Sequence, residues 1–135
     1  MIKALSVLGT RPEAIKMAPV IKELEGYAGQ IISRVCVTAQ HRYMLDQVLN
    51  LFDICPDYDL NVMQPNQALD QVTASVLTGL TPVIEKERPD WLLIQGDTTT
   101  VMAASVAAFY LGVKVGHVEA GLRTGDKRQP FPEEI

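Results

Sequence analysis

Short apolar runs along the chain predict a set of buried strands. Trp91–Ile94 is four apolar residues in a row without polar alternation, a pattern typical of strands that are buried on both faces of a parallel sheet. Three further strands are predicted at Ala4–Leu8, Ile31–Thr38 and Lys114–Glu119. The alternating stretch Asp57–Val62 is weaker and predicts an edge strand.

Apolar residues at helical spacing separate these strands. A first helix is predicted after Thr10, a suitable N-cap, and Pro19 inside it is expected to produce a kink. Three more helices are predicted at about 42–52, 68–86 and 101–111. The residues expected on the apolar faces are Ile15, Ala18, Ile21 and Leu24 in the first helix, Leu45, Val48, Leu49 and Phe52 in the second, and Leu69, Val72, Val76, Leu80, Val83 and Ile84 in the third.

The alternation of strands and helices predicts an α/β fold, a doubly wound, Rossmann-like parallel sheet with helices on both faces. The usual strand order 3-2-1-4-5 places the first and fourth strands side by side where the order reverses, so loops 9–13 and 96–100 should face one crevice. We expect this domain to cover residues 1–119. Residues 120–135 carry two glycines and two prolines and predict a loop and the start of another helix, as in the front part of a longer protein truncated before a second domain.

Composition narrows the classes of protein that fit this fold. At 135 residues, 47% hydrophobic and 21% charged, the chain is long enough for one globular domain with a core. The net charge of −4 argues against nucleic-acid binding that relies on overall charge. The N-terminus lacks the plan of a signal peptide and no apolar run reaches membrane-spanning length, so we expect a cytoplasmic protein without a membrane partner. The two cysteines and two histidines lack metal-site spacing, and no metal is expected.

Three carboxylates are candidates for acid–base chemistry. Asp97 follows the fourth strand and Glu119 ends the fifth, so both should lie on one rim of the sheet, while Glu133 lies in the loop beyond. Neighbouring carboxylates repel and their pKa values separate, which gives one site both an acid and a base. For Asp97 two interpretations stay open: chemistry, or capping of the following helix through the N–H groups of Thr99 or Thr100.

Two basic residues, Arg11 and Lys16, lie on the loop and helix that face this rim. The guanidinium group of arginine binds phosphate in a bidentate manner, and a helix N-terminus adds N–H donors. A ligand role and a structural role are equally open for Arg11, and for Lys16 the alternative is a solvated helix face. The chain has no Gly-x-Gly-x-x-Gly and no Walker loop, so ordinary dinucleotide or ATP binding is poorly supported. The residues alone predict a nucleotide or phosphosugar site with acid–base carboxylates.

Five motifs carry a resemblance to a known family. They are Gly9–Lys16, Thr38–Arg42, Gly96–Thr99, Gly116–Thr124 and Pro132–Glu134. In this order and at this spacing they resemble the non-hydrolysing UDP-N-acetylglucosamine 2-epimerases, and the similarity extends over essentially all 135 residues.

This resemblance implies a two-domain enzyme of the glycosyltransferase-B arrangement, with this chain as its N-terminal half and the active site between the halves. The implied reaction is reversible inversion at C2 of UDP-N-acetylglucosamine to UDP-N-acetylmannosamine, by elimination of UDP to a 2-acetamidoglucal and re-addition on the other face. It uses no nicotinamide, and no cofactor is expected. Matched motif by motif, Asp97, Glu119 and Glu133 fall on catalytic carboxylates, and Arg11 and Lys16 on basic residues that contact the diphosphate.

The resemblance has further implications. Gln40 and His41 match a glutamine–histidine pair of a second, activating site in some bacterial members, which makes them a candidate regulatory site. A homodimer and a role in cell-envelope polysaccharide synthesis are implied as well. Three alternatives stay open: a hydrolysing relative that releases N-acetylmannosamine and UDP, a non-catalytic sugar-nucleotide-binding fragment, and a glycosyltransferase of the same architecture. We expect the 135 residues alone to be inactive, because the family's uridine pocket belongs to the second half.

Overall fold

The computed structural model describes residues 1–39, 42–62, 64, 66–119, 125–126 and 128. Its elements follow the order β1 (Ile2–Leu8), α1 (Arg11–Gly26), β2 (Ile31–Val37), α2 (Arg42–Leu51), β3 (Tyr58–Asp59), α3 (Leu69–Glu87), β4 (Trp91–Gln95), α4 (Thr99–Tyr110) and β5 (Lys114–Val118). The five strands form one sheet in the order β3-β2-β1-β4-β5, and every pair is parallel. The predicted α/β fold and strand order are confirmed.

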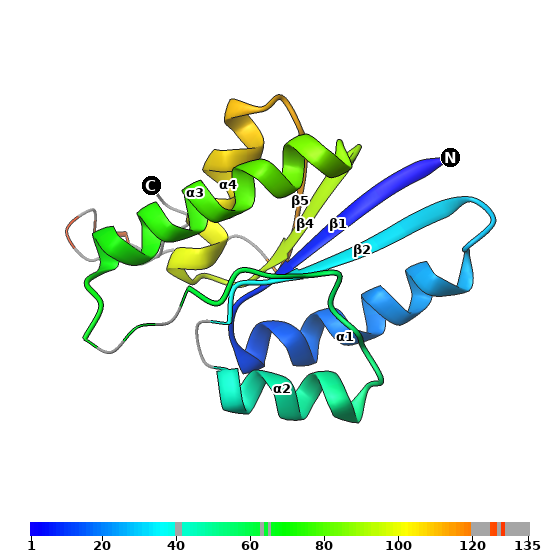
Figure 1. Cartoon of the computed structure of the whole chain (residues 1–135), viewed down its shortest axis with the longest axis horizontal. Helices are drawn as coiled ribbons and strands as arrows, with labels where there is room; N and C mark the ends of the chain where they lie inside the picture. The colour runs from blue at the N-terminus through cyan, green and yellow to red at the C-terminus, as the bar shows by residue number, and fades with distance from the viewer. Residues whose placement is uncertain (40–41, 63, 65, 120–124, 127, 129–135) are drawn as a thin grey trace.

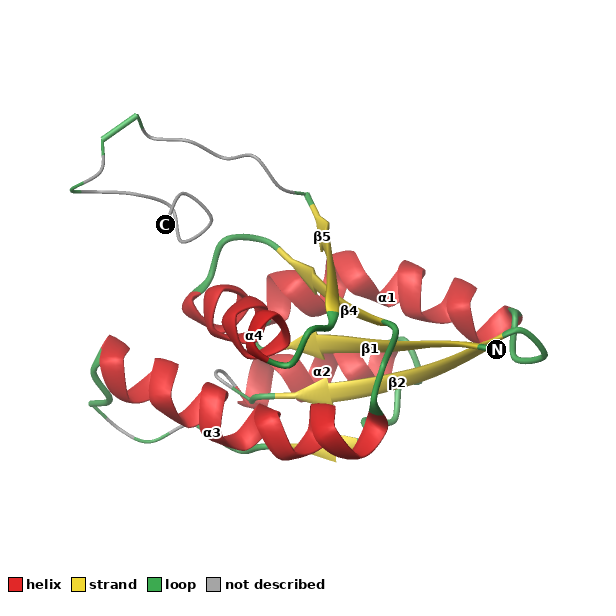
Figure 2. Ribbon diagram, turned by 90° about the horizontal axis from the view of Figure 1, so that it is seen from above, coloured by secondary structure: helices red, strands yellow, loops and turns green. Residues whose placement is uncertain are grey.

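Helices cover both faces of the sheet. Figure 1 shows α1 and α2 on one face and α3 and α4 on the other. Figure 2 views the molecule with α3 and α4 in front of the strands and α1 and α2 behind them. Successive strand residues alternate between two cores, because side chains along a strand point to opposite faces: Cys36 joins the core under α3 and α4, whereas Val35 and Val37 join the core under α1 and α2.

The buried face of α1 agrees with the prediction at Ala18 and Ile21 and differs from it at Ile15. Ile15 was expected to be buried but is 42% exposed, whereas Met17 is fully buried. The observed buried stripe has spacings of three and four residues, as in Ala14, Met17, Ala18 and Ile21. A strict step of three falls short of the 3.6-residue turn, so a stripe built from it drifts off the buried face. The expectation for Leu69 in α3 was wrong for another reason: it is the first helical residue and is 70% exposed.

The predicted edge strand 57–62 pairs over a shorter stretch than expected. Only Tyr58 and Asp59 form β3, although Leu60 and Val62 still donate backbone hydrogen bonds to β2 and the residue after it. Two residues after β3 ends, Asn61 adopts a left-handed backbone conformation with φ of 48°, which does not continue a strand. In α1 the helix continues past Pro19, which lies on its exposed side.

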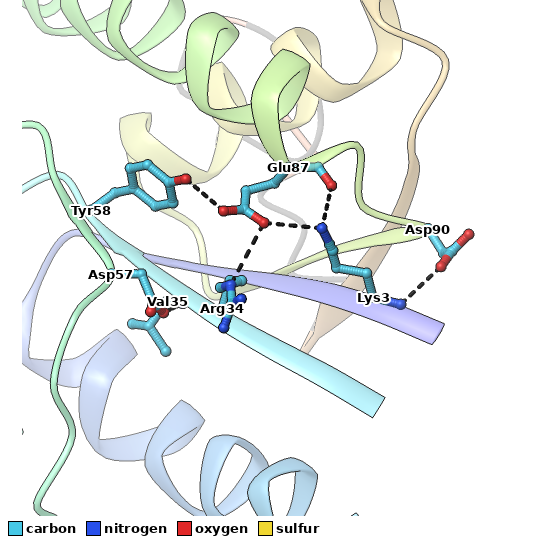
Figure 3. Close-up of polar contacts among 7 residues, drawn as sticks. All are labelled: Lys3, Arg34, Val35, Asp57, Tyr58, Glu87 and Asp90. Carbon is cyan, nitrogen blue, oxygen red and sulfur yellow. Dashed lines mark hydrogen bonds and ion pairs between the residues drawn. The ribbon is translucent and has the colours of Figure 1, made fainter. Parts of the chain in front are cut away.

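A polar cluster closes the end of the sheet where β1 begins. Glu87, the last residue of α3, accepts hydrogen bonds from the Tyr58 hydroxyl at 2.5 Å and from Lys3 Nζ at 3.2 Å, and its carboxylate lies 3.6 Å from Arg34 Nε (Figure 3). Lys3 also donates its backbone N–H to Asp90 (Figure 3). The cluster thereby joins α3 to β1, β2, β3 and the start of β4.

Candidate active site

The site lies at the carboxyl edge of the sheet, where the strand order reverses between β1 and β4. A pocket of about 180 Å³ opens there between the loop after β1, the loop after β4 and the residue after β5. Its lining includes Thr10, Glu13, Lys16, Gln95, Asp97 and Glu119. Ligands of doubly wound folds bind at this position. The predicted position of Asp97, Glu119 and Lys16 at one rim of the sheet is confirmed, and their roles stay a prediction.

Lys16 and Glu119 form an ion pair across the pocket. Lys16 Nζ donates a short hydrogen bond to Glu119 Oε2, and both side chains are about half exposed, at 48% and 50%. Gln95, the last residue of β4, donates from Nε2 to the same oxygen at 2.6 Å. Gln95 is only 3% exposed, so Glu119 accepts from a buried amide on one side and from a half-exposed ammonium on the other.

The surroundings of Glu119 favour its ionised form. The hydrogen bond from Lys16 is the main cause that lowers the pKa of Glu119 below its usual value, and the hydrogen bond from Gln95 lowers it further. The backbone of Glu119 is left-handed, with φ of 57°, which is uncommon for a residue other than glycine. Strained backbone of this kind is often found at functional sites, because the surrounding structure must hold it.

Asp97 lines the pocket without being the cap of the next helix. The N-cap of α4 is Thr98, whose hydroxyl accepts a hydrogen bond from the Val101 N–H at 3.4 Å. The capping interpretation of Asp97 is therefore wrong. Asp97 directly precedes this N-cap and lines the pocket, and its role in chemistry stays a prediction.

The turn that presents Asp97 depends on Gly96 and His117. Gly96 has φ of 88°, a conformation that side chains disfavour. Its carbonyl lies 2.7 Å from His117 Nε2. A carbonyl can only accept, so this ring nitrogen carries the proton. His117 thus holds the backbone of the turn from the neighbouring strand β5.

Glu13 is the most buried carboxylate at the site, with 2% of its surface exposed. Its Oε2 accepts hydrogen bonds from the Gly9 N–H, the Thr10 N–H and the Thr10 hydroxyl, and its Oε1 accepts one from the Thr98 hydroxyl at 2.7 Å. Burial raises the pKa of Glu13 above its usual value, and these hydrogen bonds oppose the rise. None of these four donors is a cation, so the hydrogen bonds alone offset the cost of burying the carboxylate.

Arg11 lies beside the carboxylate pocket rather than in it. It lines a neighbouring groove of about 510 Å³ together with Pro12, Ile15, Lys16 and Met44. Lys16 lines both hollows. The first two turns of α1 therefore present two cations at adjoining positions, Arg11 at the groove and Lys16 between the groove and the carboxylate pocket.

Three of the predicted residues, Glu133, Gln40 and His41, lie outside the described residues. Two residues of the site were not singled out from the sequence. Glu13 stands three positions after Thr10, the spacing of a capping box, which could have signalled it. Gln95 is a polar residue at the carboxyl end of an otherwise apolar strand, and this position could also have indicated a site residue, although less strongly.

Two negative findings hold for the part of the chain that the structure describes. Within it, no helix is both long and apolar enough to cross a membrane. In the same residues, no three side chains of histidine, cysteine, aspartate or glutamate come together in a way that could hold a metal ion.

Fold and site together define a class: a Rossmann-like α/β domain with carboxylates, cations and helix N-termini at one ligand crevice. The sequence pattern of the family described as UDP-N-acetylglucosamine 2-epimerase matches residues 22–135. The chain belongs to this family.

Several relatives share this similarity. The UDP-N-acetylglucosamine 2-epimerase of Neisseria meningitidis is 59% identical over 98% of this chain and 36% of its own length, and that of Escherichia coli K12 is 59% identical over 98% and 35%. The crystal structure of the Neisseria meningitidis enzyme bound to UDP-GlcNAc superimposes with a TM-score of 0.91. The Methanocaldococcus jannaschii enzyme, solved in complex with UDP-GlcNAc and UDP, is 35% identical with a TM-score of 0.87 over 97% of this chain and 36% of its own. The chain spans about a third of the length of these relatives.

Proposed function

We propose that this chain forms the N-terminal domain, residues 1–119 and the linker that follows, of an enzyme that interconverts UDP-N-acetylglucosamine and UDP-N-acetylmannosamine. The observation that carries the proposal is the pocket at the strand reversal, where Asp97 and the Lys16–Glu119 pair meet. Relatives with 59% identity bear the name of this activity, and one of them was crystallised with UDP-GlcNAc.

The reaction requires a proton to leave C2 on one face and return on the other. In the forward direction the C2–H electrons become the C1=C2 double bond, while the C1–O electrons depart with UDP. UDP then adds back to C1 as a proton is delivered to the opposite face of C2. Asp97 and Glu119 come from neighbouring strands and offer two acid–base groups to one sugar, and Glu133 would be a third.

The cations stabilise the departing diphosphate in this proposal. Lys16 and Arg11 lie on the first turns of α1, whose N-terminal N–H groups and dipole favour negative charge. The ammonium of Lys16 lines the pocket and pairs with Glu119, so in this proposal it stabilises the negative charge that develops on the leaving phosphate.

The test is a proton NMR time course of UDP-N-acetylglucosamine with the complete gene product in D2O. We expect loss of the C2 proton signal and growth of UDP-N-acetylmannosamine, both abolished by Asp97→Asn and by Glu119→Gln. Glu23→Gln on the exposed side of α1 is the matched control and should keep full activity.

The other outcomes of this experiment separate the alternatives. Free N-acetylmannosamine with UDP would identify a hydrolysing enzyme. Binding of the sugar nucleotide without exchange would identify a non-catalytic binding module. The same assay on the 135-residue chain should show no exchange, because the domain supplies only one wall of the site.

We propose in addition that the enzyme works in the cytoplasm as a homodimer and supplies cell-envelope polysaccharide synthesis. The support is the resemblance of its motifs to those of the family. Sedimentation equilibrium of the complete gene product should give twice the mass of one chain, and a monomer mass would contradict the homodimer.

A further inference from the structure

Glu13 receives hydrogen bonds from two segments that are far apart in the sequence. Three donors belong to Gly9 and Thr10, in the loop immediately before α1. The fourth is the hydroxyl of Thr98, which is 85 residues away and starts α4. One buried carboxylate therefore ties the loop after β1 to the loop after β4.

Local helix capping explains only part of this arrangement. The bond from the Thr10 N–H back to Glu13 is the usual reach-back contact of a capping box. A capping box needs no partner on another helix, and an exposed glutamate would serve it as well. The bond from Thr98 and the near-complete burial of Glu13 have no part in capping α1.

The two tied loops carry the chemistry of the site. On one side, Arg11 directly follows Thr10, and Lys16 lies three residues after Glu13. On the other side, Asp97 directly precedes Thr98. The Thr98 hydroxyl donates to Glu13 and also accepts from Val101, so it links the carboxylate to the first turn of α4. The separation between the cations and Asp97 thus depends on the length of the Glu13 side chain.

We propose that Glu13 is a positioning residue of the epimerase, and that its carboxylate fixes Asp97 relative to Lys16 through Thr98. This inference rests on the proposed function. Glu13 lines the pocket, but its two carboxylate oxygens accept from Gly9, Thr10 and Thr98, so in this role it acts through the loops that it joins. A misplacement of about 1 Å is enough to lower a rate by about 10²-fold, so a short, buried bridge between the two halves of a site has a large effect on turnover.

Two substitutions break the bridge in different ways. Glu13→Asp keeps the negative charge at the start of α1 but is one methylene shorter, so it cannot reach both Thr10 and Thr98. Thr98→Val keeps the size of the side chain and removes the hydroxyl, and with it the N-cap bond of α4, while the bonds from Gly9 and Thr10 to Glu13 stay intact, so Glu13→Asp is the variant that breaks the bridge without removing that cap. Glu23→Asp, the same change on the exposed side of α1, is the matched control, and Thr98→Ser is the conservative rescue.

The experiment measures kcat and KM for UDP-N-acetylglucosamine in the complete gene product, with thermal melting of each variant. For Glu13→Asp and Thr98→Val we expect kcat to fall by about 10²-fold with KM within about threefold, at a temperature where both are fully folded. Thr98→Ser should recover most of the lost kcat. Wild-type kcat in either bridge-breaking variant would overturn the proposal, and so would a loss of kcat that merely follows the loss of folded protein.

Amide hydrogen exchange decides the matter independently of activity. If Glu13 holds the loop, the backbone amides of residues 97–99 should exchange at least about tenfold faster in both bridge-breaking variants than in the wild type. Unchanged exchange would overturn the proposal. An inactive wild-type protein would instead refute the proposed function, while the exchange rates would still report whether the bridge exists.

Discussion

At the scale of single residues, Gly9 shows how closely the site is packed. A Cβ added at this position would lie 2.8 Å from the hydroxyl oxygens of both Thr38 and Thr100, which are buried. We expect Gly9→Ala to destabilise the chain by about 1–3 kcal/mol, the usual cost of an overpacked core. Urea denaturation measures this change. Gly29→Ala is the control, since its added Cβ meets no atom within 4 Å, and an equal loss there would contradict the explanation.

The ion pair at the site predicts a change in titration. Lys16→Met removes the main cause that lowers the pKa of Glu119, so that pKa should rise toward the ordinary value of about 4.3. Carbon-13 NMR of the glutamate carboxyl groups follows this titration directly. Lys22→Met, which removes a lysine paired with Glu25 on the same helix, should leave the Glu119 midpoint unchanged. A Glu119 midpoint that ignores Lys16 would show that the pair does not persist in solution.

Sequence reasoning located some of these residues and missed others for a physical reason. Asp97 and Glu119 are predictable because each follows a strand, and parallel neighbours end at the same edge. For Glu13 the capping-box spacing predicts the contact with Thr10, but its bond to Thr98 comes from another helix, and no spacing within one helix reveals it. Glu119 was predicted at the rim, but its pairing with Lys16 and Gln95 follows only from the three-dimensional arrangement.

At the scale of elements, α1 carries a proline that the helix tolerates at a cost. Pro19 cannot donate the backbone hydrogen bond to the carbonyl of Ile15, and it lies on the exposed side. Pro19→Ala should stabilise the chain by about 1–2 kcal/mol, because the restored hydrogen bond outweighs the gain in freedom of the unfolded chain. Thermal melting checks this. A lower melting temperature would mean that the proline fits a bend on which the core depends.

The Glu87 cluster predicts how stability depends on pH. The Tyr58 hydroxyl is the main cause that lowers the pKa of Glu87, with Lys3 and Arg34 contributing. A lowered pKa means that this stabilisation is present above the unfolded value of about 4.3 and is lost as the pH falls through the folded one. Glu87→Gln should therefore cost about 1–3 kcal/mol at pH 7 and progressively less below about pH 4.

At alkaline pH the hydrogen bond between Tyr58 and Glu87 is lost through ionisation of the tyrosine, and the pH dependence of stability has the opposite sign. The bond to Glu87 raises the pKa of Tyr58, so its contribution is present below about pH 10 and is lost as the pH rises through the raised value. Urea denaturation across the pH range compares the wild type with Glu87→Gln, and Glu85→Gln on the exposed side of α3 is the control. A difference that stays constant from pH 3 to pH 8 would contradict this assignment.

The elements themselves could be predicted well, and their faces less well. The strands and helices follow from apolar runs and their spacing, and the strand order was predicted from the usual arrangement of doubly wound folds. In α1, Ala18 and Ile21 are buried as predicted, but Ile15 was predicted in place of Ala14, because Ile15 is larger and more apolar although Ala14 lies on the buried stripe. Hydrophobicity indicates that a helix has a buried face, and the geometry of packing decides which one.

At the scale of the whole molecule, the Glu87 cluster and the candidate site lie toward opposite ends of β1. The Glu87 cluster ties the amino end through Lys3, and the site begins after Leu8 at the carboxyl end. Lys3 and Leu8 are five positions apart along β1, roughly 17 Å at the usual rise of a strand. Groups so far apart without shared partners contribute independently to the free energy.

This separation predicts how variants at the two edges combine. In the complete gene product, Glu87→Gln should lower the melting temperature while leaving kcat within about twofold, and Lys16→Met should lower kcat while leaving the melting temperature nearly unchanged. The double variant should show both losses in full, with a coupling below about 0.5 kcal/mol in either quantity. A larger coupling would mean that the sheet transmits strain between its edges. The close packing of both cores against the strands would then make the rigidity of the whole domain, rather than the bridge at Glu13 alone, the factor that fixes the geometry of the site.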